Sequence, residues 1–374
     1  MKNSGYCLST NVSNSCLMGF RSPSITKELA INISKLLDRH VSFMEVCGTH
    51  TVAIFRHGLR ELLPRRIKLI SGPGCPVCVT SAGEIAAFVS LADSPKVIIA
   101  TFGDLMRVPG PDGSLAQARA RGARVEVVYS PMDALKLAQR EPDHLVVFPA
   151  IGFETTVPTV AATLNVARRL KVSNFAIYSA HKLMPPVLNT LFSSSDVDVD
   201  GLLCPGHVSS IIGAKAYEEI ADQYHIPCVV GGFEPVDILR ALYLLVNQVV
   251  SGVCKVENAY DRAVSWEGNK RAIDMIQQIF EPVDAEWRGL GSIPASGLAL
   301  RDEWEEFDAA KRLDLVIPKV SDPPGCLCGV IIKGSALPSD CPLFGSACTP
   351  LHPVGPCMVS SEGTCAAYYR YGGI

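Results

Sequence analysis

The sequence has no long run of lysine or arginine and no long run of apolar residues. Its 34 Lys and Arg are balanced by 37 Asp and Glu, giving a formal net charge of −3. A basic surface for nucleic acid or anionic lipid is therefore not expected. No apolar stretch approaches the roughly 18 residues of a membrane span. The first residues also lack the apolar core of a signal peptide. We therefore expect a cytoplasmic protein whose partners are small molecules or other proteins.

The length and composition predict a globular protein of more than one domain. The chain has 374 residues, of which 48% are hydrophobic and 19% charged. This length exceeds what one hydrophobic core usually organises, so two or three domains are expected.

Cysteine is unusually frequent and unevenly placed. Six of the 14 cysteines lie between Cys326 and the C-terminus. In a long chain without an export signal thiols are kept reduced, so metal binding or redox chemistry explains them better than structural disulfides do.

The hydrophobic pattern predicts an α/β fold. Residues 21–40 have apolar residues at helical spacing, and from residue 41 short apolar runs alternate with helical segments. Such alternation predicts parallel sheets covered by helices on both faces. The predicted strands are 67–70, 97–100, 125–129, 145–148, 175–178, 201–203 and 227–230. Beyond residue 255 the pattern predicts helices over 260–279 and 302–313, followed by a tail rich in Pro, Gly and Cys.

Polar residues follow several of the predicted strands. Ligand sites of parallel sheets lie beyond the carboxyl ends of the strands, so these residues are expected to share a polar cleft. Each residue alone is more often a helix cap or an ion-pair partner. The candidates are Asp104, Arg107, Glu154, Thr155, Thr156, His181, Lys182, His207, Glu234 and Asp237.

The cysteine-rich tail is the first candidate for a metal site. Thiolates in loops rich in Gly and Pro suit an iron–sulfur cluster, because such backbones can turn several sulfurs toward one centre. The spacing favours Cys341, Cys348, Cys357 and Cys365 as ligands, whereas Cys326 and Cys328 are too close in sequence to bind one metal without strain. A zinc site and a set of unligated cysteines are the alternatives.

The second candidate is the pair Cys75 and Cys78 in the segment GPGCPVC. This spacing permits reversible disulfide formation, and a position at a helix start favours a reactive thiolate. A dithiol redox role is therefore preferred over half of a zinc site.

The third candidate is the segment EVCGTH, which consists of Glu45, Val46, Cys47, Gly48, Thr49 and His50. A thiolate at Cys47 would be stabilised by the helix expected after it, and His50 is close enough to act as a ligand or proton carrier. A buried, unreactive cysteine is an equally good interpretation of these residues alone.

From about Phe20 onward the chain resembles the HypD family of hydrogenase maturation factors. The resemblance is specific because many motifs occur in the family's order. They are MEVCGTHT, GPGCPVC, TFGDLMRVPG, GFETT, SAHKLMPP, DGLLCPGHVS, GGFEPVDIL, SGLAL and the tail from DCPLFG to SSEGTC.

The resemblance implies a scaffold on which the Fe(CN)₂CO group of nickel–iron hydrogenase is assembled. In the family the iron is held by the cysteine of the CGTH motif, which is Cys47 in this chain, together with a cysteine of the small partner HypC. The partner HypE delivers cyanide. Cys75 and Cys78 and a 4Fe–4S cluster in the tail would form a redox relay. For Cys47 to bind iron, its sulfur should be exposed at a cleft and ionised near neutral pH.

The resemblance also implies two similar α/β domains and a third domain made from both chain ends. We therefore expect a first domain over residues 41–140, a second over 141–254, and an iron–sulfur domain over 19–40 and 255–374. Residues 1–18 would be an extension. Two other functions fit the residues: an iron–sulfur-dependent thiol oxidoreductase that holds no iron at Cys47, and a structural zinc adaptor.

Overall fold

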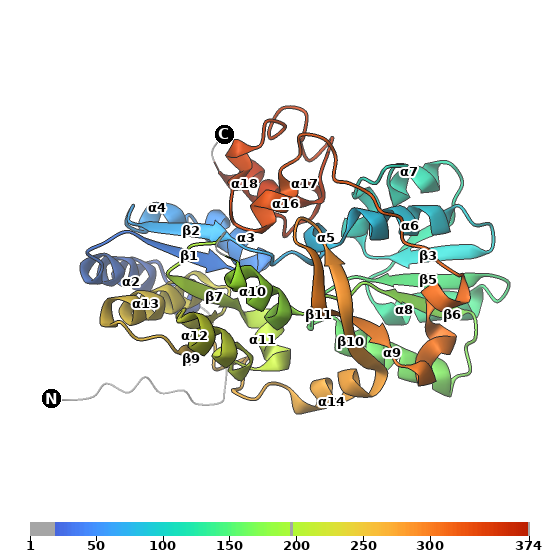
Figure 1. Cartoon of the computed structure of the whole chain (residues 1–374), viewed down its shortest axis with the longest axis horizontal. Coiled ribbons are helices and arrows are strands. Elements are labelled where there is room, and N and C mark those ends of the chain that lie inside the picture. The colour runs from blue at the N-terminus through green and yellow to red at the C-terminus, as the bar shows by residue number, and fades with distance from the viewer. Residues whose placement is uncertain (1–18, 195–196, 373–374) are drawn as a thin grey trace.

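The computed structural model describes residues 19–194 and 197–372 and has an α/β architecture (Figure 1). Two parallel sheets lie side by side, a long hairpin runs between them, and the C-terminal tail packs on top (Figure 1). The parallel sheets confirm the predicted fold class. The predicted extension 1–18, with Cys7 and Cys16, lies outside the described residues.

The first sheet joins strands that are far apart in the sequence. Its order is β2-β1-β7-β8-β9, and every neighbouring pair is parallel. The strands are β1 (Val41–Glu45), β2 (Ile67–Ser71), β7 (Gly201–Pro205), β8 (Cys228–Gly231) and β9 (Val256–Asn258). Helices cover both faces, so all residues of the central strands β7 and β8 are buried, as is typical of parallel strands.

The second sheet lies within one continuous part of the chain. Its order is β4-β3-β5-β6, again entirely parallel. The strands are β3 (Val97–Thr101), β4 (Val125–Val127), β5 (Leu145–Ala150) and β6 (Phe175–Ser179). All residues of β3 are buried. Each strand run predicted from the sequence is therefore a strand in the structure.

The helices begin at caps that the sequence supplies. Ser81 and Glu84 form a capping box at the start of α6, and Ser130 caps α8 immediately before Pro131. The helices around the two sheets are α2 (Pro23–Leu36), α3 (Gly48–Arg56), α4 (Leu59–Leu62), α5 (Pro76–Val79), α6 (Ala82–Ala92), α7 (Leu115–Ala120), α8 (Pro131–Arg140), α9 (Val157–Arg169), α10 (Met184–Ser193), α11 (Gly206–Ile212), α12 (Glu218–Tyr224) and α13 (Pro235–Ser251).

The strand pairing divides the chain differently from the predicted domains 41–140 and 141–254. Strands β1 and β2 pair with strands beyond residue 200, and β3 to β6 form a sheet of their own. The chain therefore crosses from the first sheet to the second through α5 and α6, and returns through α10 (Figure 1). Pairing between parallel strands is non-local, so the order of elements in the sequence did not reveal where the chain crosses.

Helix α2 was expected to join the C-terminal tail and instead belongs to the first sheet. It packs against α13 (Figure 1). Ala30, Ile33 and Leu37 contribute to the same core cluster as Phe43 and Leu242. An apolar helix face shows that a helix packs against something, but not against which partner.

The region after residue 258 contains an antiparallel hairpin that the sequence analysis missed. It consists of β10 (Phe280–Trp287) and β11 (Gly291–Leu300). Only α14 (Lys270–Ile279) of the predicted helix 260–279 is helical. The predicted helix 302–313 is a 3₁₀ helix, η3 (Asp302–Phe307), followed by the short α15 (Ala309–Arg312).

The hairpin contacts both segments through which the chain passes from one sheet to the other, the one between α5 and α6 and the one before α10. Single bridges join Thr80 to Trp287 and Lys182 to Gly297. The tail that follows contains only short helices, α16 (Cys328–Ile332), α17 (Pro356–Val359) and α18 (Thr364–Tyr371). Among the described residues, no helix has the length and apolar character needed to span a bilayer.

Candidate metal and dithiol site

Cys47 occupies the junction between β1 and α3. It is the N-cap residue of α3 and is only 7% exposed. The backbone N–H of Gly48 donates to the carbonyl of Gly74 at 3.0 Å. This bond places the segment that carries Cys75 directly beside Cys47.

The environment of Cys47 keeps its thiol protonated, which corrects the prediction of an exposed, ionised sulfur. Burial raises the pKa of Cys47 to about 12, and the nearby Glu362 carboxyl adds to this shift. The backbone N–H groups of Thr49 and His50 at the start of α3 lower the pKa, but they do not outweigh desolvation. A metal ion bound here would have to displace the proton.

His50 is held by a hydrogen bond to the first sheet. Its Nε2 lies 3.0 Å from the carbonyl oxygen of Gly232, which can only accept, so Nε2 carries the proton. Burial lowers the pKa of His50 to about 4, which makes the ring neutral. Its Nδ1 is buried and has no hydrogen-bond partner. The ring also packs 4.6 Å from that of Phe233.

Cys75 and Cys78 are joined by a disulfide bond. Cys75 is the N-cap residue of α5, and its Sγ accepts the backbone N–H of Cys78 at 3.2 Å. Both residues are buried. The disulfide confirms that this pair can close as its spacing predicted, whereas its role in a relay remains a prediction.

The tail cysteines gather around Cys328 and Cys357. Hydrogen bonds with Cys328 and Cys365 raise the pKa of Cys357, and hydrogen bonds with Cys328 and Cys357 lower the pKa of Cys365 to about 6. Cys326 is in turn hydrogen-bonded to Cys328, which raises the pKa of Cys326. Cys328 was expected to stand apart from the predicted ligands, but the fold brings it to the centre of the group.

The other two predicted ligands lie around this group. Cys348 accepts the backbone N–H of Val354 at 3.3 Å, and burial raises the pKa of its thiol. Cys341 is buried, and its Sγ lies 3.8 Å from the carbonyl oxygen of Gly325. Sequence spacing did not reveal these neighbours because the tail folds back on itself through turns.

The donor set of the tail fits a sulfur-ligated cluster. It offers soft thiol donors in mostly buried positions, which suit iron–sulfur chemistry or zinc. A Cβ at Gly355 would lie 2.5 Å from Sγ of Cys328 and 2.8 Å from Sγ of Cys326, so only glycine leaves room for both sulfurs. Within residues 19–194 and 197–372, however, no three His, Cys, Asp or Glu side chains are already arranged as ligands of one metal ion.

The three sulfur sites lie in one continuous region of the molecule. Helices α16 and α17 contact α5, which carries the disulfide, and α18 packs against α3 (Figure 1). Cys75, Cys78, Cys357 and Cys365 belong to a single core cluster, together with Val46 beside Cys47. The dithiol segment therefore contacts both the Cys47 segment and the tail, and the tail also contacts the Cys47 segment directly through α18 and α3.

Glu362 is a site residue that the sequence analysis did not single out. Its carboxylate accepts the hydroxyl of Thr49, and a Cβ at Gly48 would lie 2.4 Å from its backbone oxygen. The neighbouring Ser361 donates its hydroxyl to Asp104 at 3.0 Å. In the sequence, the position of Glu362 between Cys357 and Cys365 was the signal that could have identified it as a site residue.

The polar loop residues do not gather in one cleft. Asp104 binds the tail, Glu234 pairs with Arg21, and Asp237 pairs with Arg262. Glu154 accepts the backbone N–H of Met184 at 2.8 Å. Of these four residues, Glu234 and Asp237 are ion-pair partners, whereas Asp104 and Glu154 accept hydrogen bonds from neighbouring segments.

Comparison with known proteins identifies close relatives over almost the whole chain. A family model described as "HypD: Hydrogenase formation hypA family" matches residues 24–372. The hydrogenase maturation factor HypD of Rhizobium leguminosarum bv. viciae is 47% identical over 363 residues, covering 94% of each chain. HypD of Escherichia coli K12 is 48% identical over 346 residues, covering 92% of this chain and 93% of the relative.

Proposed function

The chain belongs to the HypD family, whose members act in hydrogenase maturation, and on this premise we propose that it is the scaffold and redox component for assembly of the Fe(CN)₂CO group. A HypC-type chaperone and a HypE-type cyanide donor are its proposed partners. The iron group is the substrate of this process and is passed on to the hydrogenase.

The observation that carries the proposal is that the disulfide segment lies next to both the Cys47 segment and the cysteine-bearing helices α16 and α17. Gly74 contacts the backbone of Cys47, and α17 with Cys357 contacts α5. A redox group that serves an iron-binding thiol must lie next to it, and an electron source must lie next to the redox group. The contacts of the disulfide segment with the Cys47 segment and with the tail support both requirements.

Cys47 would bind iron as a thiolate and must lose its proton when it does so. The charge of the Glu362 carboxylate acts on Cys47, and this carboxylate is linked to the start of α3 through the Thr49 hydroxyl. Burial raises the pKa of Glu362 above its usual range, which makes it a better proton acceptor once ionised. Glu362 is therefore the proposed acceptor of the Cys47 proton.

The tail cysteines would hold a 4Fe–4S cluster, for which Cys341, Cys348, Cys357 and Cys365 remain the proposed ligands. Such a cluster supplies electrons one at a time. Opening the disulfide takes two electrons and two protons and leaves thiols at Cys75 and Cys78. The buried position of both sulfurs restricts this exchange to groups that the protein itself brings near.

An iron–sulfur-dependent thiol oxidoreductase is the second candidate, and the burial of Cys47 favours it. A thiol that is 7% exposed with a pKa of about 12 is a poor metal ligand in the isolated chain. In this alternative the cluster reduces the disulfide, and Cys47 is a packing residue.

Infrared spectroscopy of the anaerobic complex with HypC tests the two alternatives. The scaffold predicts absorption bands of iron-bound CN and CO that disappear in Cys47→Ser, because a hydroxyl binds low-spin iron poorly. Cys254→Ser is the matched control, since Cys254 lies elsewhere and donates to the carbonyl of His225. Absence of these bands from the wild-type complex would favour the oxidoreductase. Bands that survive in Cys47→Ser would show that Cys47 is a packing residue and does not bind the iron. The visible spectrum of the same samples separates an iron–sulfur cluster from zinc.

A further inference from the structure

The 3₁₀ helix η1 (Gly103–Arg107) follows β3 of the second sheet and contacts the tail at two places. Asp104 accepts hydrogen bonds from the turn 360–363, which joins α17 to α18. Arg107 donates to the carbonyl of Pro350 at 3.2 Å. This helix therefore attaches the tail to the second sheet.

A single oxygen of Asp104 makes all of these contacts with the turn. Its Oδ2 accepts the backbone N–H of Ser361 at 3.1 Å and the Ser361 hydroxyl at 3.0 Å. The Ser360 hydroxyl also donates to Oδ2, at 3.3 Å, and its oxygen accepts the backbone N–H of Glu362 at 3.2 Å. Hydrogen bonds to a carboxylate are stronger than neutral ones. Asp104 therefore fixes the backbone that carries the Glu362 side chain.

The first sheet contacts the same turn through the start of α3. The Thr49 hydroxyl donates to the Glu362 carboxylate, and a Cβ at Gly48 would lie 2.4 Å from the backbone oxygen of Glu362. A Cβ at Gly363 would lie 2.1 Å from the carbonyl oxygen of Cys357, so the turn also packs tightly against α17. Glu362 therefore lies where the tail meets both sheets.

Asp104 and Glu362 are close enough for their charges to interact. Burial raises the pKa of Glu362, and the charge of Asp104 adds to this rise, whereas the hydrogen bond from Thr49 opposes it. Asp104 can therefore act on Glu362 through its charge or through the position of the turn. The three hydrogen bonds to Oδ2 favour position, and a variant that keeps the acceptor but removes the charge separates the two.

We propose that Asp104 is a positioning residue of the Cys47 site. It holds the turn 360–363 so that the Glu362 carboxylate stays on the Thr49 hydroxyl at the start of α3. A residue of the second sheet thereby orients a group that acts on a thiol of the first sheet. The consequence for iron rests on the proposed scaffold function, whereas the placement of the turn does not.

Amide hydrogen exchange of the full chain, followed by mass spectrometry, tests the placement of the turn. Asp104→Ala removes the acceptor, whereas Asp104→Asn keeps an oxygen acceptor and removes only the charge. Losing hydrogen bonds to a charged group shifts a local equilibrium by about tenfold or more. The amides of residues 47–50 and 360–363 should therefore exchange at least about tenfold faster in Asp104→Ala. Asp104→Asn should recover most of the protection.

Asp112→Ala is the matched control, because Asp112 is an exposed acidic residue in the loop that follows η1. It should exchange like the wild type. Thermal unfolding checks that all three variants are folded. Wild-type exchange in Asp104→Ala, or exchange in Asp104→Asn as fast as in Asp104→Ala, would overturn the proposal.

Infrared spectroscopy of the anaerobic HypC complex measures the consequence for iron. We expect weaker CN and CO bands in Asp104→Ala and bands of wild-type intensity in Asp104→Asn. Full intensity in Asp104→Ala would overturn the positioning role. Absence of the bands from the wild-type complex would instead count against the scaffold function, and hydrogen exchange would still decide whether Asp104 holds the turn.

Discussion

Gly74 lies against Cys47 so closely that no side chain fits between them. A Cβ at position 74 would be 2.3 Å from the backbone nitrogen of Cys47. This contact fixes the position of the disulfide segment relative to the candidate iron ligand. It also explains in steric terms why the segment GPGCPVC needs glycine immediately before its first cysteine.

The first prediction is that Gly74→Ala separates the two segments. The added methyl group collides with backbone that cannot rotate away, so we expect a loss of stability of about 1–3 kcal/mol. Denaturant unfolding measures it. Gly103→Ala is the control, because the nearest atom to a Cβ there is 3.9 Å away. Equal stability of the two variants would mean that the contact at Gly74 is easily relaxed.

The second prediction concerns the ligands of the tail. Cys357→Ala and Cys365→Ala should each remove the visible absorption of the anaerobically purified protein, because both cysteines belong to the spacing-based set and to the group seen in the fold. Cys341→Ala should do the same and Cys328→Ala should not. If Cys328→Ala removed the absorption and Cys341→Ala kept it, Cys328 would be the fourth ligand and Cys341 would not.

The third prediction is a pH dependence of stability due to Glu154. Burial raises its pKa to about 7, and its Oε2 has no partner. A carboxyl whose pKa is raised in the folded state costs stability when it ionises. Stability is therefore lost as the pH rises from the ordinary value of 4.5 through about 7.

Glu154→Gln should remove this dependence, because an amide keeps the acceptor for Met184 but does not ionise. Above the folded pKa the variant should be more stable than the wild type by about 3 kcal/mol, as follows from the size of the shift. Unfolding curves at acidic and mildly alkaline pH measure this difference. Glu126 is exposed, so Glu126→Gln is the control and should show the same dependence of unfolding free energy on pH as the wild type. If Glu154→Gln also showed the wild-type dependence, Glu154 would be hydrated, which would contradict the prediction.

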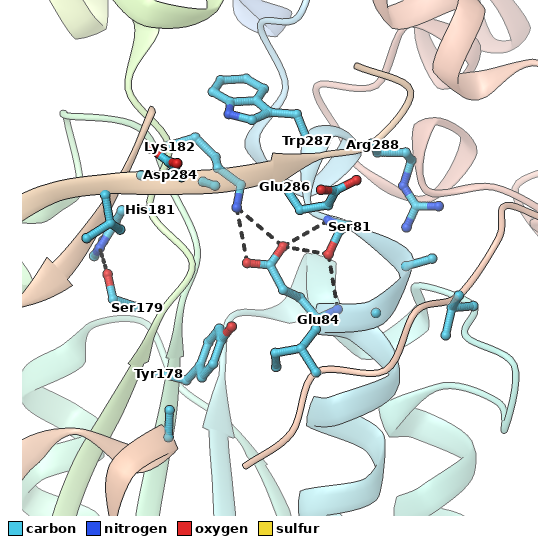
Figure 2. A pocket seen from close by; sticks show the side chains of 18 of the residues that line it. Ser81, Glu84, Tyr178, Ser179, His181, Lys182, Asp284, Glu286, Trp287 and Arg288 are labelled. Carbon is cyan, nitrogen blue, oxygen red and sulfur yellow. Dashed lines mark hydrogen bonds and ion pairs between the residues drawn. The ribbon is translucent and has the colours of Figure 1, made fainter. Parts of the chain in front are cut away.

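The fourth prediction concerns the buried pair of Lys182 and Glu84 (Figure 2), whose charged groups are 3.1 Å apart and whose side chains are 2% and 8% exposed. Lys182→Met leaves the Glu84 carboxylate buried without its cation, which should cost about 3–5 kcal/mol. The double variant Lys182→Met with Glu84→Gln should recover much of this loss, because no unpaired charge remains. Breaking the exposed pair of Lys215 and Glu267 by Lys215→Met is the control and should change stability little. A small effect of Lys182→Met alone would contradict a dry environment for the pair.

The sequence by itself indicated strands β2 to β8 and the ability of Cys75 and Cys78 to form a disulfide, but not strands β1 and β9. The starts of α6 and α8 are likewise set locally, by the caps Ser81 and Ser130. These features depend on residues close together in the chain, through period, capping and loop spacing. The hairpin 280–300 was missed because glycine, proline and interrupted alternation weaken its strand pattern.

Only the tertiary structure decided which strands share a sheet, that α2 packs on α13, and that Cys328 lies among the ligand candidates. It also decided that Cys47 is a buried, protonated thiol. A helix start predicted a low pKa, but burial in the surrounding core, together with the smaller effect of the tail residue Glu362, raises the pKa of Cys47 instead. Desolvation depends on every segment that packs around a group, and those segments come from more than 300 positions away along this chain.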